Sequence, residues 1–297
     1  MSGISWADVD GRLVRRVTTR WAGQSLTLTN NEPFGAGMQL WLVDLEGWYG
    51  GVDLVGESVQ RALGHGLFPT PSRRTGRVLT LEGLLQLESE ADRTVAERYL
   101  SGLLGDGELG EITYSVSEGP ELTAQVKLDG PVKITPIGFD MVKFQAPLLA
   151  PDPFLYGDTQ EATLNIPGAG EGLKWGPGIV KGGYMRWGGS VPPARLSNAG
   201  NADSWPVFEV RGVFPEGFTL TMNQQTIEFT GLVTTKAPVV VDTGAGQITQ
   251  RGRDVTHLLA RRQWAPIPPR STLTPRLAAR SRLSEGWAVA RWADTYI

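Results

Sequence analysis

The stretch RVLTLEGLLQLES, residues 77–89, decides the fold class of this chain. Alternate residues of a β-strand point to opposite faces. In this stretch one face carries the leucines Leu79, Leu81, Leu85 and Leu87, and the other carries mostly polar residues, which predicts a long half-buried strand. The same period of two recurs in EITYSVS (111–117), ELTAQVKLD (121–129) and MQLWLVDL (38–45), where the inward residues are expected to be Trp41, Val43 and Leu45. Together these segments predict an antiparallel sheet with one wet face.

A single helix is expected between these strands, from about Ser89 to Leu104. Ser89 followed by Asp92 resembles a capping box, in which a hydroxyl satisfies a free backbone N–H at the start of a helix. Apolar residues then recur at helical spacing, which predicts a buried stripe made of Val95, Tyr99 and Leu103.

The length of 297 residues suits about two domains. Three prolines crowd into APLLAPDPFLYG, residues 146–157, and we place the domain boundary there, giving domains 1–157 and 158–297. The second half again contains short strands, including VFEVRGVF (207–214), FTLTM (218–222) and TIEFT (226–230). The residues expected to face inward are Phe208 and Val210 in the first, Phe218, Leu220 and Met222 in the second, and Ile227 and Phe229 in the third. Turn signals separate these strands at intervals of about 8 to 12 residues, which is typical of a β-sandwich.

Several classes of function are excluded or disfavoured by composition. The chain has no cysteine and only two histidines, His65 and His257, so disulfides, thiolate sites and multi-histidine metal sites are excluded. Neither a G-x-S-x-G elbow nor a P-loop occurs, and we therefore expect no enzyme, no cofactor and no metal site. We also expect no membrane segment and no signal peptide, because no apolar run approaches about 18 residues.

Charge is distributed unevenly. Residues 251–297 hold nine arginines and three acidic residues, a balance of +6, so residues 1–250 carry −9 within a net charge of −3. Arg261 and Arg262 are candidate partner contacts in this basic end. No known nucleic-acid docking motif accompanies the arginines, so pairing with carboxylates of the same domain or of a neighbouring protein is favoured over nucleic-acid binding.

The segment EGLKWGPGIVKGGYMRWGGSVPP, residues 171–193, interleaves large aromatic rings with glycines. Its rings could cap the core, contact another subunit or bind a sugar. Capping and subunit contact are favoured, because tryptophan and tyrosine are common at protein interfaces. The candidate contact residues are Trp175, Tyr184 and Trp187.

Three further motifs carry a family resemblance. They are the Gly- and Arg-rich loop HGLFPTPSRRTGR (65–77), the junction A-P-D-P-x-x-Y-G at residues 150–157, and N-x-G-x-x-x-x-x-P, formed by Asn198, Gly200 and Pro206. In this order they resemble the distal tail proteins of long-tailed, siphovirus-type bacteriophages, the phage tail component family. The resemblance covers nearly the whole chain and departs in residues 172–190.

The resemblance implies an all-β protein with one helix. The first domain would be a ring-forming β-sandwich or split barrel, and the second a galectin-like β-sandwich. Such proteins form a homo-hexameric ring at the tail tip of the virion, which would be assembled in the host cytoplasm. The ring joins the tail tube protein to the tail tip or baseplate proteins and leaves a channel for the tape measure protein and, transiently, DNA.

Two alternatives remain open. The chain could be a carbohydrate-binding or polysaccharide-cleaving β-sandwich module for host-surface recognition, since a galectin-like sandwich with exposed aromatics suits sugars. It could also be another tail or baseplate component that uses the same ring domain.

Overall fold

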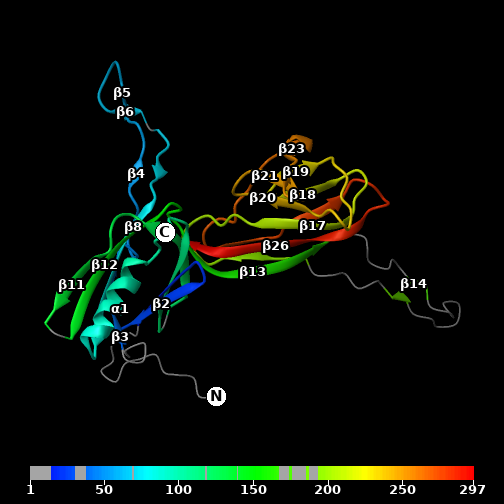
Figure 1. The fold of residues 1–297 in the computed structure, drawn as a ribbon. Coiled ribbons are helices and arrows are strands. Elements are labelled where there is room, and N and C mark those ends of the chain that lie inside the picture. The colour runs from blue at the N-terminus through cyan, green and yellow to red at the C-terminus, as the bar shows by residue number, and fades with distance from the viewer. Residues whose placement is uncertain are drawn as a thin grey trace. The chain divides into compact units, whose positions relative to one another are not determined.

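The computed structural model describes residues 15–30, 38–68, 70–117, 119–138, 140–166, 174–175, 185–186 and 193–297. Among these residues the fold is nearly all β, with a single α-helix, which confirms the fold class expected from the alternation (Figure 1). The chain divides into two compact units, residues 1–157 together with Ile297, and residues 158–296. The boundary between them falls inside one strand, β13 (Leu155–Asn165).

The first unit is built on a sheet that closes on itself. The order is β11-β12-β8-β3-β2-β1-β9-β10, and a further pairing of β10 with β12 closes the barrel. All these pairings are antiparallel except a single parallel contact between β2 and β3, which the sequence did not predict. The strands are β1 (Arg15–Trp21), β2 (Gln24–Thr29), β3 (Met38–Glu46), β8 (Arg77–Leu87), β9 (Gly110–Val116), β10 (Leu122–Leu128), β11 (Lys133–Ile137) and β12 (Met141–Ala150).

Strand β8 supplies the centre of this barrel, as its sequence predicted. Leu79, Leu81, Leu85 and Leu87 are all buried. Between them Gly83 lies directly opposite Phe144 of β12. A Cβ at position 83 would lie 2.4 Å from the Phe144 ring, so only glycine lets this fully buried ring pack flat on the strand.

Strand β3 departs from the expected alternation. Leu42 and Leu45 are buried, whereas Val43 is exposed. The pairing of β3 with β8 shifts by one residue between Leu42 and Asp44, which is a β-bulge. Val43 is the extra residue of the bulge and lies outside the core, and Trp41, next to the buried Leu42, is only half-buried. Of the three residues expected to face inward, Leu45 is buried, whereas the expectation was wrong for Val43 and Trp41.

A long β-hairpin arm leaves the barrel between β3 and β8. It comprises residues 47–76 and contains β4 (Leu54–Val55) paired with β7 (Arg73–Arg74), and β5 (Val59–Gln60) paired with β6 (Leu67–Phe68). Figure 1 shows it in blue and cyan, projecting from the body of its unit. Residues 65–76 of the Gly- and Arg-rich stretch, which were expected to form a loop, make up the second half of this arm and lead back to β8.

Helix α1 (Glu90–Ser101) confirms the predicted helix and its cap. The Ser89 hydroxyl accepts a hydrogen bond from the Asp92 N–H at 3.2 Å. The predicted stripe is only partly right. Leu103 is buried just beyond the helix as expected, but Ala96 and Leu100 are the buried helical residues, while Val95 is 57% exposed and Tyr99 38% exposed. Helical spacing alone could not show which of two adjacent faces of the helix is buried. The barrel packs against Ala96 and Leu100 rather than against Val95.

The second unit is a β-sandwich. Strands β13, β26, β17, β20, β21 and β22 form one sheet in that order, and β23, β19, β18 and β25 form the other. Inward side chains from both sheets make the core, including Phe208 and Val210 of β17, as predicted. The elements are β16 (Leu196–Asn198), β17 (Val207–Val213), β18 (Phe218–Met222), β19 (Gln225–Phe229), β20 (Val239–Asp242), β21 (Gln247–Gln250), β22 (Arg253–Asp254), the 3₁₀ turn η2 (Thr256–Leu258), β23 (Leu259–Arg262), β24 (Ser271–Leu273), β25 (Arg276–Ala279) and β26 (Glu285–Tyr296).

Two short pairings complete this unit. β16 pairs with β24, and β14 (Lys174–Trp175) pairs antiparallel with β15 (Met185–Arg186). Phe218 anchors the core between two other rings. Its centroid lies 6.0 Å from that of Phe214 in an edge contact and 5.3 Å from that of Phe229. Such aromatic pairs add about 0.5 to 1.5 kcal/mol beyond their burial.

The helix supports a direct prediction. Val95→Pro should lower the unfolding free energy by about 3 kcal/mol or more, because proline removes an intrahelical hydrogen bond and clashes with the preceding turn. Val95→Ala at this exposed position should change it by less than about 0.5 kcal/mol. Urea unfolding of both variants measures the difference, and equal stabilities would contradict the helical assignment.

Candidate assembly surfaces

Arg77 is a buried charged residue at the start of β8, and its side chain is 2% exposed. Its Nη1 donates to the carbonyls of Gly47 and Trp48 at 2.9 and 3.0 Å, and its Nε donates to the Pro153 carbonyl at 3.0 Å. Burial lowers the pKa of this guanidinium, and the charge of Arg74 acts in the same direction. Arginine nevertheless stays protonated in proteins, so the charge is held by backbone carbonyls.

The junction motif at residues 150–157 forms a turn that is held by one of its own carboxylates, that of Asp152. Asp152 accepts the N–H of Phe154 at 3.1 Å and the hydroxyl of Tyr156 at 2.6 Å. Burial, followed by the hydrogen bond to Asp152, raises the pKa of the Tyr156 phenol. The motif therefore forms a turn locked by one carboxylate, and its Pro153 carbonyl is the one that Arg77 holds. The role of these residues is structural.

Replacing Arg77 tests how much this anchor contributes. Arg77→Ala should lower the unfolding free energy by about 3 kcal/mol, because three carbonyls lose their donor and an unsatisfied buried acceptor costs about 1 to 3 kcal/mol. Arg73→Ala, at an exposed position on β7, is the matched control and should stay within about 0.5 kcal/mol of the wild type. Guanidinium unfolding followed by tryptophan fluorescence gives both values. Equal effects would show that Arg77 is not an anchor.

Asn198 plays a similar part in the second unit. Its buried amide Nδ2 donates to the carbonyls of Ala202 and Ile267 at 2.7 and 3.1 Å, and its Oδ1 accepts the N–H groups of Gly200 and Thr295 at 3.0 and 3.2 Å. A Cβ at Gly200 would lie 1.9 Å from the Thr295 carbonyl oxygen, so only glycine fits there. The motif formed by Asn198, Gly200 and Pro206 therefore also has a structural role.

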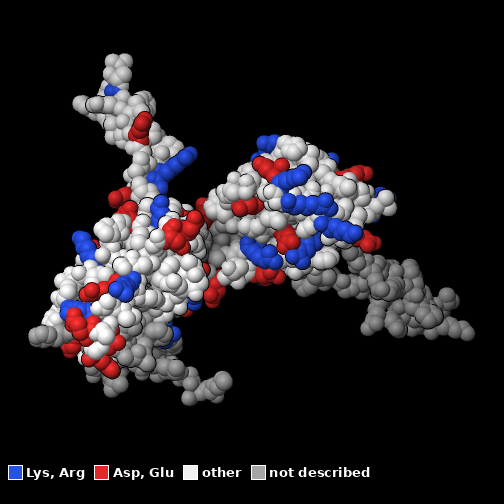
Figure 2. All heavy atoms as spheres, viewed as in Figure 1, with Lys and Arg blue, Asp and Glu red and all other residues white. Residues whose placement is uncertain are grey.

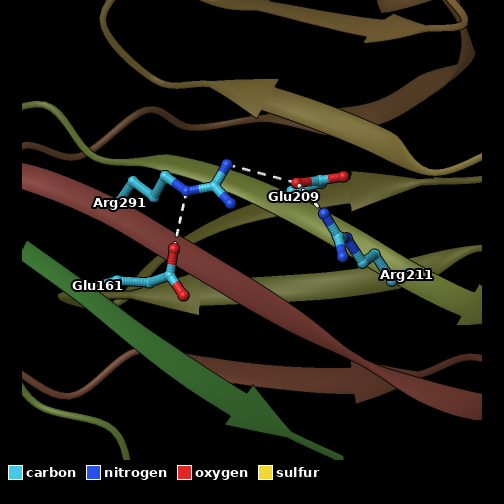
Figure 3. A network of polar contacts seen from close by, with 4 residues as sticks. All are labelled: Glu161, Glu209, Arg211 and Arg291. Atoms are coloured by element: carbon cyan, nitrogen blue, oxygen red, sulfur yellow. Dashed lines mark hydrogen bonds and ion pairs between the residues drawn. The ribbon is translucent and has the colours of Figure 1, made fainter.

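The outer face of the six-stranded sheet carries a network of four charged side chains from three neighbouring strands (Figure 3). Arg291 of β26 donates through Nε to Glu161 of β13 at 2.9 Å and through Nη1 to Glu209 of β17 at 3.4 Å. Arg211 donates to the same Glu209 oxygen at 2.9 Å. Trp287 lies directly opposite Arg211 on β26 and is 43% exposed. The face therefore combines paired charges with an accessible indole.

Glu209 is the centre of this network. Its side chain is 16% exposed, while the two arginines are each 46% exposed. The hydrogen bond from Arg211 lowers the pKa of Glu209 most; burial opposes this, and the charges of Arg211 and Arg291 add to the lowering. The carboxylate is therefore ionised at neutral pH, which keeps both guanidinium groups in place.

This lowered pKa predicts a pH-dependent stability. A carboxyl group whose pKa is lower in the folded state stabilises it above the unfolded pKa, here about 4.5, and that contribution is lost as the pH falls through the folded value. Wild type should exceed Glu209→Gln by about 1 kcal/mol at neutral pH, and the gap should close as the pH falls below 4.5. Thermal unfolding across this pH range measures it. A gap of constant size across this pH range would contradict the prediction.

Of the nine arginines in the basic end, Arg291 and Arg280 pair with acidic residues of their own unit, as expected for that segment. Arg280 pairs with Glu228 of β19. The candidate contact Arg261 lies opposite Glu228 on β23, and Arg262 follows it; both are exposed. The structure thus places the two candidate arginines on the surface of the four-stranded sheet without showing a partner for their role in assembly, which stays a prediction.

The aromatic candidates fall mainly outside the described residues. Tyr184 and Trp187 lie outside them, and Trp175 is described only as a backbone position in β14. Their role as partner contacts stays a prediction. Trp287 was not predicted to be a contact residue. The structure places it on the surface beside charged groups. Its alternation with Ala288 and Ala290, both buried, is the signal that could have found it.

Within the described parts of the chain, no group of three or more histidine, aspartate or glutamate side chains could hold a metal ion. The same residues contain no helix of the length and apolarity needed to cross a membrane. His65 lies in the arm between β5 and β6, and His257 in the turn η2.

Comparison with known proteins identifies the fold. No protein-family model and no curated protein matches the chain. Among solved structures, the Dit protein of phage SPP1, described as a paradigm of the hub of the adsorption apparatus in phages that infect Gram-positive bacteria, is similar over 95% of this chain and 99% of its own. The TM-score is 0.62 and the identity 13%. A chain of the phage P2 baseplate in its activated conformation aligns over 96% of this chain and 98% of its own, with 9% identity and a TM-score of 0.49. The likeness to SPP1 Dit shows that the two chains share a fold.

Proposed function

We propose that this protein is a structural component of a bacteriophage tail, a distal tail protein that forms a six-membered ring at the tail tip. The observation that carries the proposal is the shared fold with SPP1 Dit over nearly the full length of both chains. A likeness confined to one unit would support only a common domain. Here both units, in the same order, have counterparts in a protein described as a hub.

The chemistry of the described residues supports the same proposal. The motifs that resemble the distal tail family turn out to lock turns and strands, through Arg77, Asp152 and Asn198. The surfaces carry paired charges and exposed apolar side chains, which suit contacts between proteins. In this role the ring joins the tail tube protein to the tip proteins, and the tape measure protein and DNA only pass through. The protein has no enzymatic role in this proposal.

The ring can be tested directly with the purified full-length chain. We expect a particle of six times the chain mass of 32.2 kDa in solution, and rings with sixfold symmetry by negative-stain electron microscopy. Light scattering over a dilution series gives the mass independently of particle shape. A chain that stays monomeric at every concentration would contradict the proposed ring.

A carbohydrate-binding module is the second candidate, and one observation favours it. Trp287 is exposed beside Arg211 and the Glu209 network, and an indole flanked by hydrogen-bonding groups can bind the face of a sugar ring. A glycan array separates the candidates. Binding that is lost in Trp287→Ala and kept in Trp205→Ala, at another exposed tryptophan, would favour the module over the ring.

A further inference from the structure

The arm formed by residues 47–76 exposes an unusual amount of apolar surface. Leu63 is 96% exposed, and six other apolar or aromatic residues are each more than half exposed: Tyr49, Leu54, Val55, Val59, Leu67 and Phe68. Single exposed apolar residues are normal on a protein surface, but a concentration of them on one element marks an interaction site. Seven such residues on one hairpin therefore indicate a surface that another molecule covers.

The arm is also ordered in a way that suits binding. The Thr75 N–H donates to the Asp53 carbonyl at 3.0 Å near its base, and the Arg61 N–H donates to the Gly66 carbonyl at 3.2 Å near its tip. The Arg61 guanidinium lies 5.7 Å from the centre of the Phe68 ring. These contacts hold both limbs together while the apolar side chains stay accessible, and a preformed binding element loses less entropy on association.

A second, partly exposed apolar surface lies on helix α1 of the same unit. Val95 and Tyr99 are one helical turn apart, on the side of the helix next to the buried Ala96 and Leu100, and they are 57% and 38% exposed. Tyr99 is held in place, since its hydroxyl donates to the Ser25 carbonyl at 2.9 Å and its ring packs against Trp21 with centroids 6.2 Å apart. Val95 and the fixed Tyr99 ring therefore give α1 an accessible apolar surface.

The two surfaces have opposite charge. Residues 88–108, which contain α1, carry six acidic residues and two arginines, a balance of −4. The arm, residues 47–76, carries three arginines and two acidic residues, a balance of +1. Figure 2 shows few charged groups along the arm, and both acidic and basic groups at its base and around α1. Opposite charge around apolar centres favours pairing of one surface with the other.

We propose that the arm of one copy of this chain packs its apolar side chains against the exposed side of α1 in a neighbouring copy. The contact joins two different patches, so it is a head-to-tail interface, and repeated head-to-tail contacts close into a ring when the rotation allows. The inference rests on the proposed ring and names its subunit contact. A second copy is the occupant because both complementary surfaces belong to the same chain.

The absence of cysteine makes the contact directly testable by cross-linking. The full-length Leu63→Cys, Val95→Cys double variant, treated with a short bismaleimide, should give a ladder of covalent oligomers on a denaturing gel. Each single variant should give no species larger than a dimer, since one thiol per chain cannot extend a ladder. The pair Leu63→Cys with Leu283→Cys is the matched control, because Leu283 is 80% exposed but lies in the second unit; it should give no ladder.

Disrupting the arm separates this inference from the proposed ring. The Leu63→Asp, Phe68→Asp double variant should raise the concentration for half assembly by at least about tenfold. It should leave the melting temperature of the dilute, unassembled chain unchanged, because both side chains are exposed. Leu283→Asp should assemble like the wild type. If wild type and the arm variant both form hexamers equally and the ladder is absent, the arm contact is wrong and the ring stands, leaving the arm to a different protein. If the wild type never assembles, the ring and the contact both fail.

Discussion

The buried guanidinium of Arg77 is the interaction on which the first unit depends. It binds carbonyls from the end of β3 and from the segment before β13, which lie 30 and 76 residues away in sequence. Burying a charge is costly unless hydrogen bonds compensate it. Three carbonyls do so for Nε and Nη1 of Arg77, whereas its buried Nη2 has no partner among the described residues, so these segments must meet at the start of β8. The arm base, the central strand and the proline-rich junction are thereby fixed together.

Asn198 has the same role in the sandwich, where one amide joins β16 to the end of β26. The family-like motifs therefore hold each unit together. The described residues also present three surfaces: an apolar arm, an exposed side of α1, and a charged face centred on Glu209. Surfaces that combine apolar side chains with paired charges suit contacts between proteins.

Local patterns of the sequence predicted much of this fold. The alternating leucines of β8 and the inward residues of β17, β18 and β19 are buried as expected, and Ser89 caps the one helix. The candidate surface residues were predicted less well. Arg261 and Arg262 are exposed as expected of contacts, but Trp287 and the arm were not selected. Position 77 shares the parity of the buried leucines, so alternation could have marked its arginine as an inward-facing charge.

The sequence by itself determined the strands, the helix with its cap, and the absence of thiol chemistry, because these follow from backbone periodicity and residue type. Only the tertiary structure decided which neighbours each residue meets. It placed a bulge after Leu42, turned α1 so that Val95 faces outward, and brought Glu161 to Arg291 across 130 residues. The physical reason is that strand periodicity is local, whereas register, packing face and ion-pair partners depend on long-range contacts that no short stretch encodes.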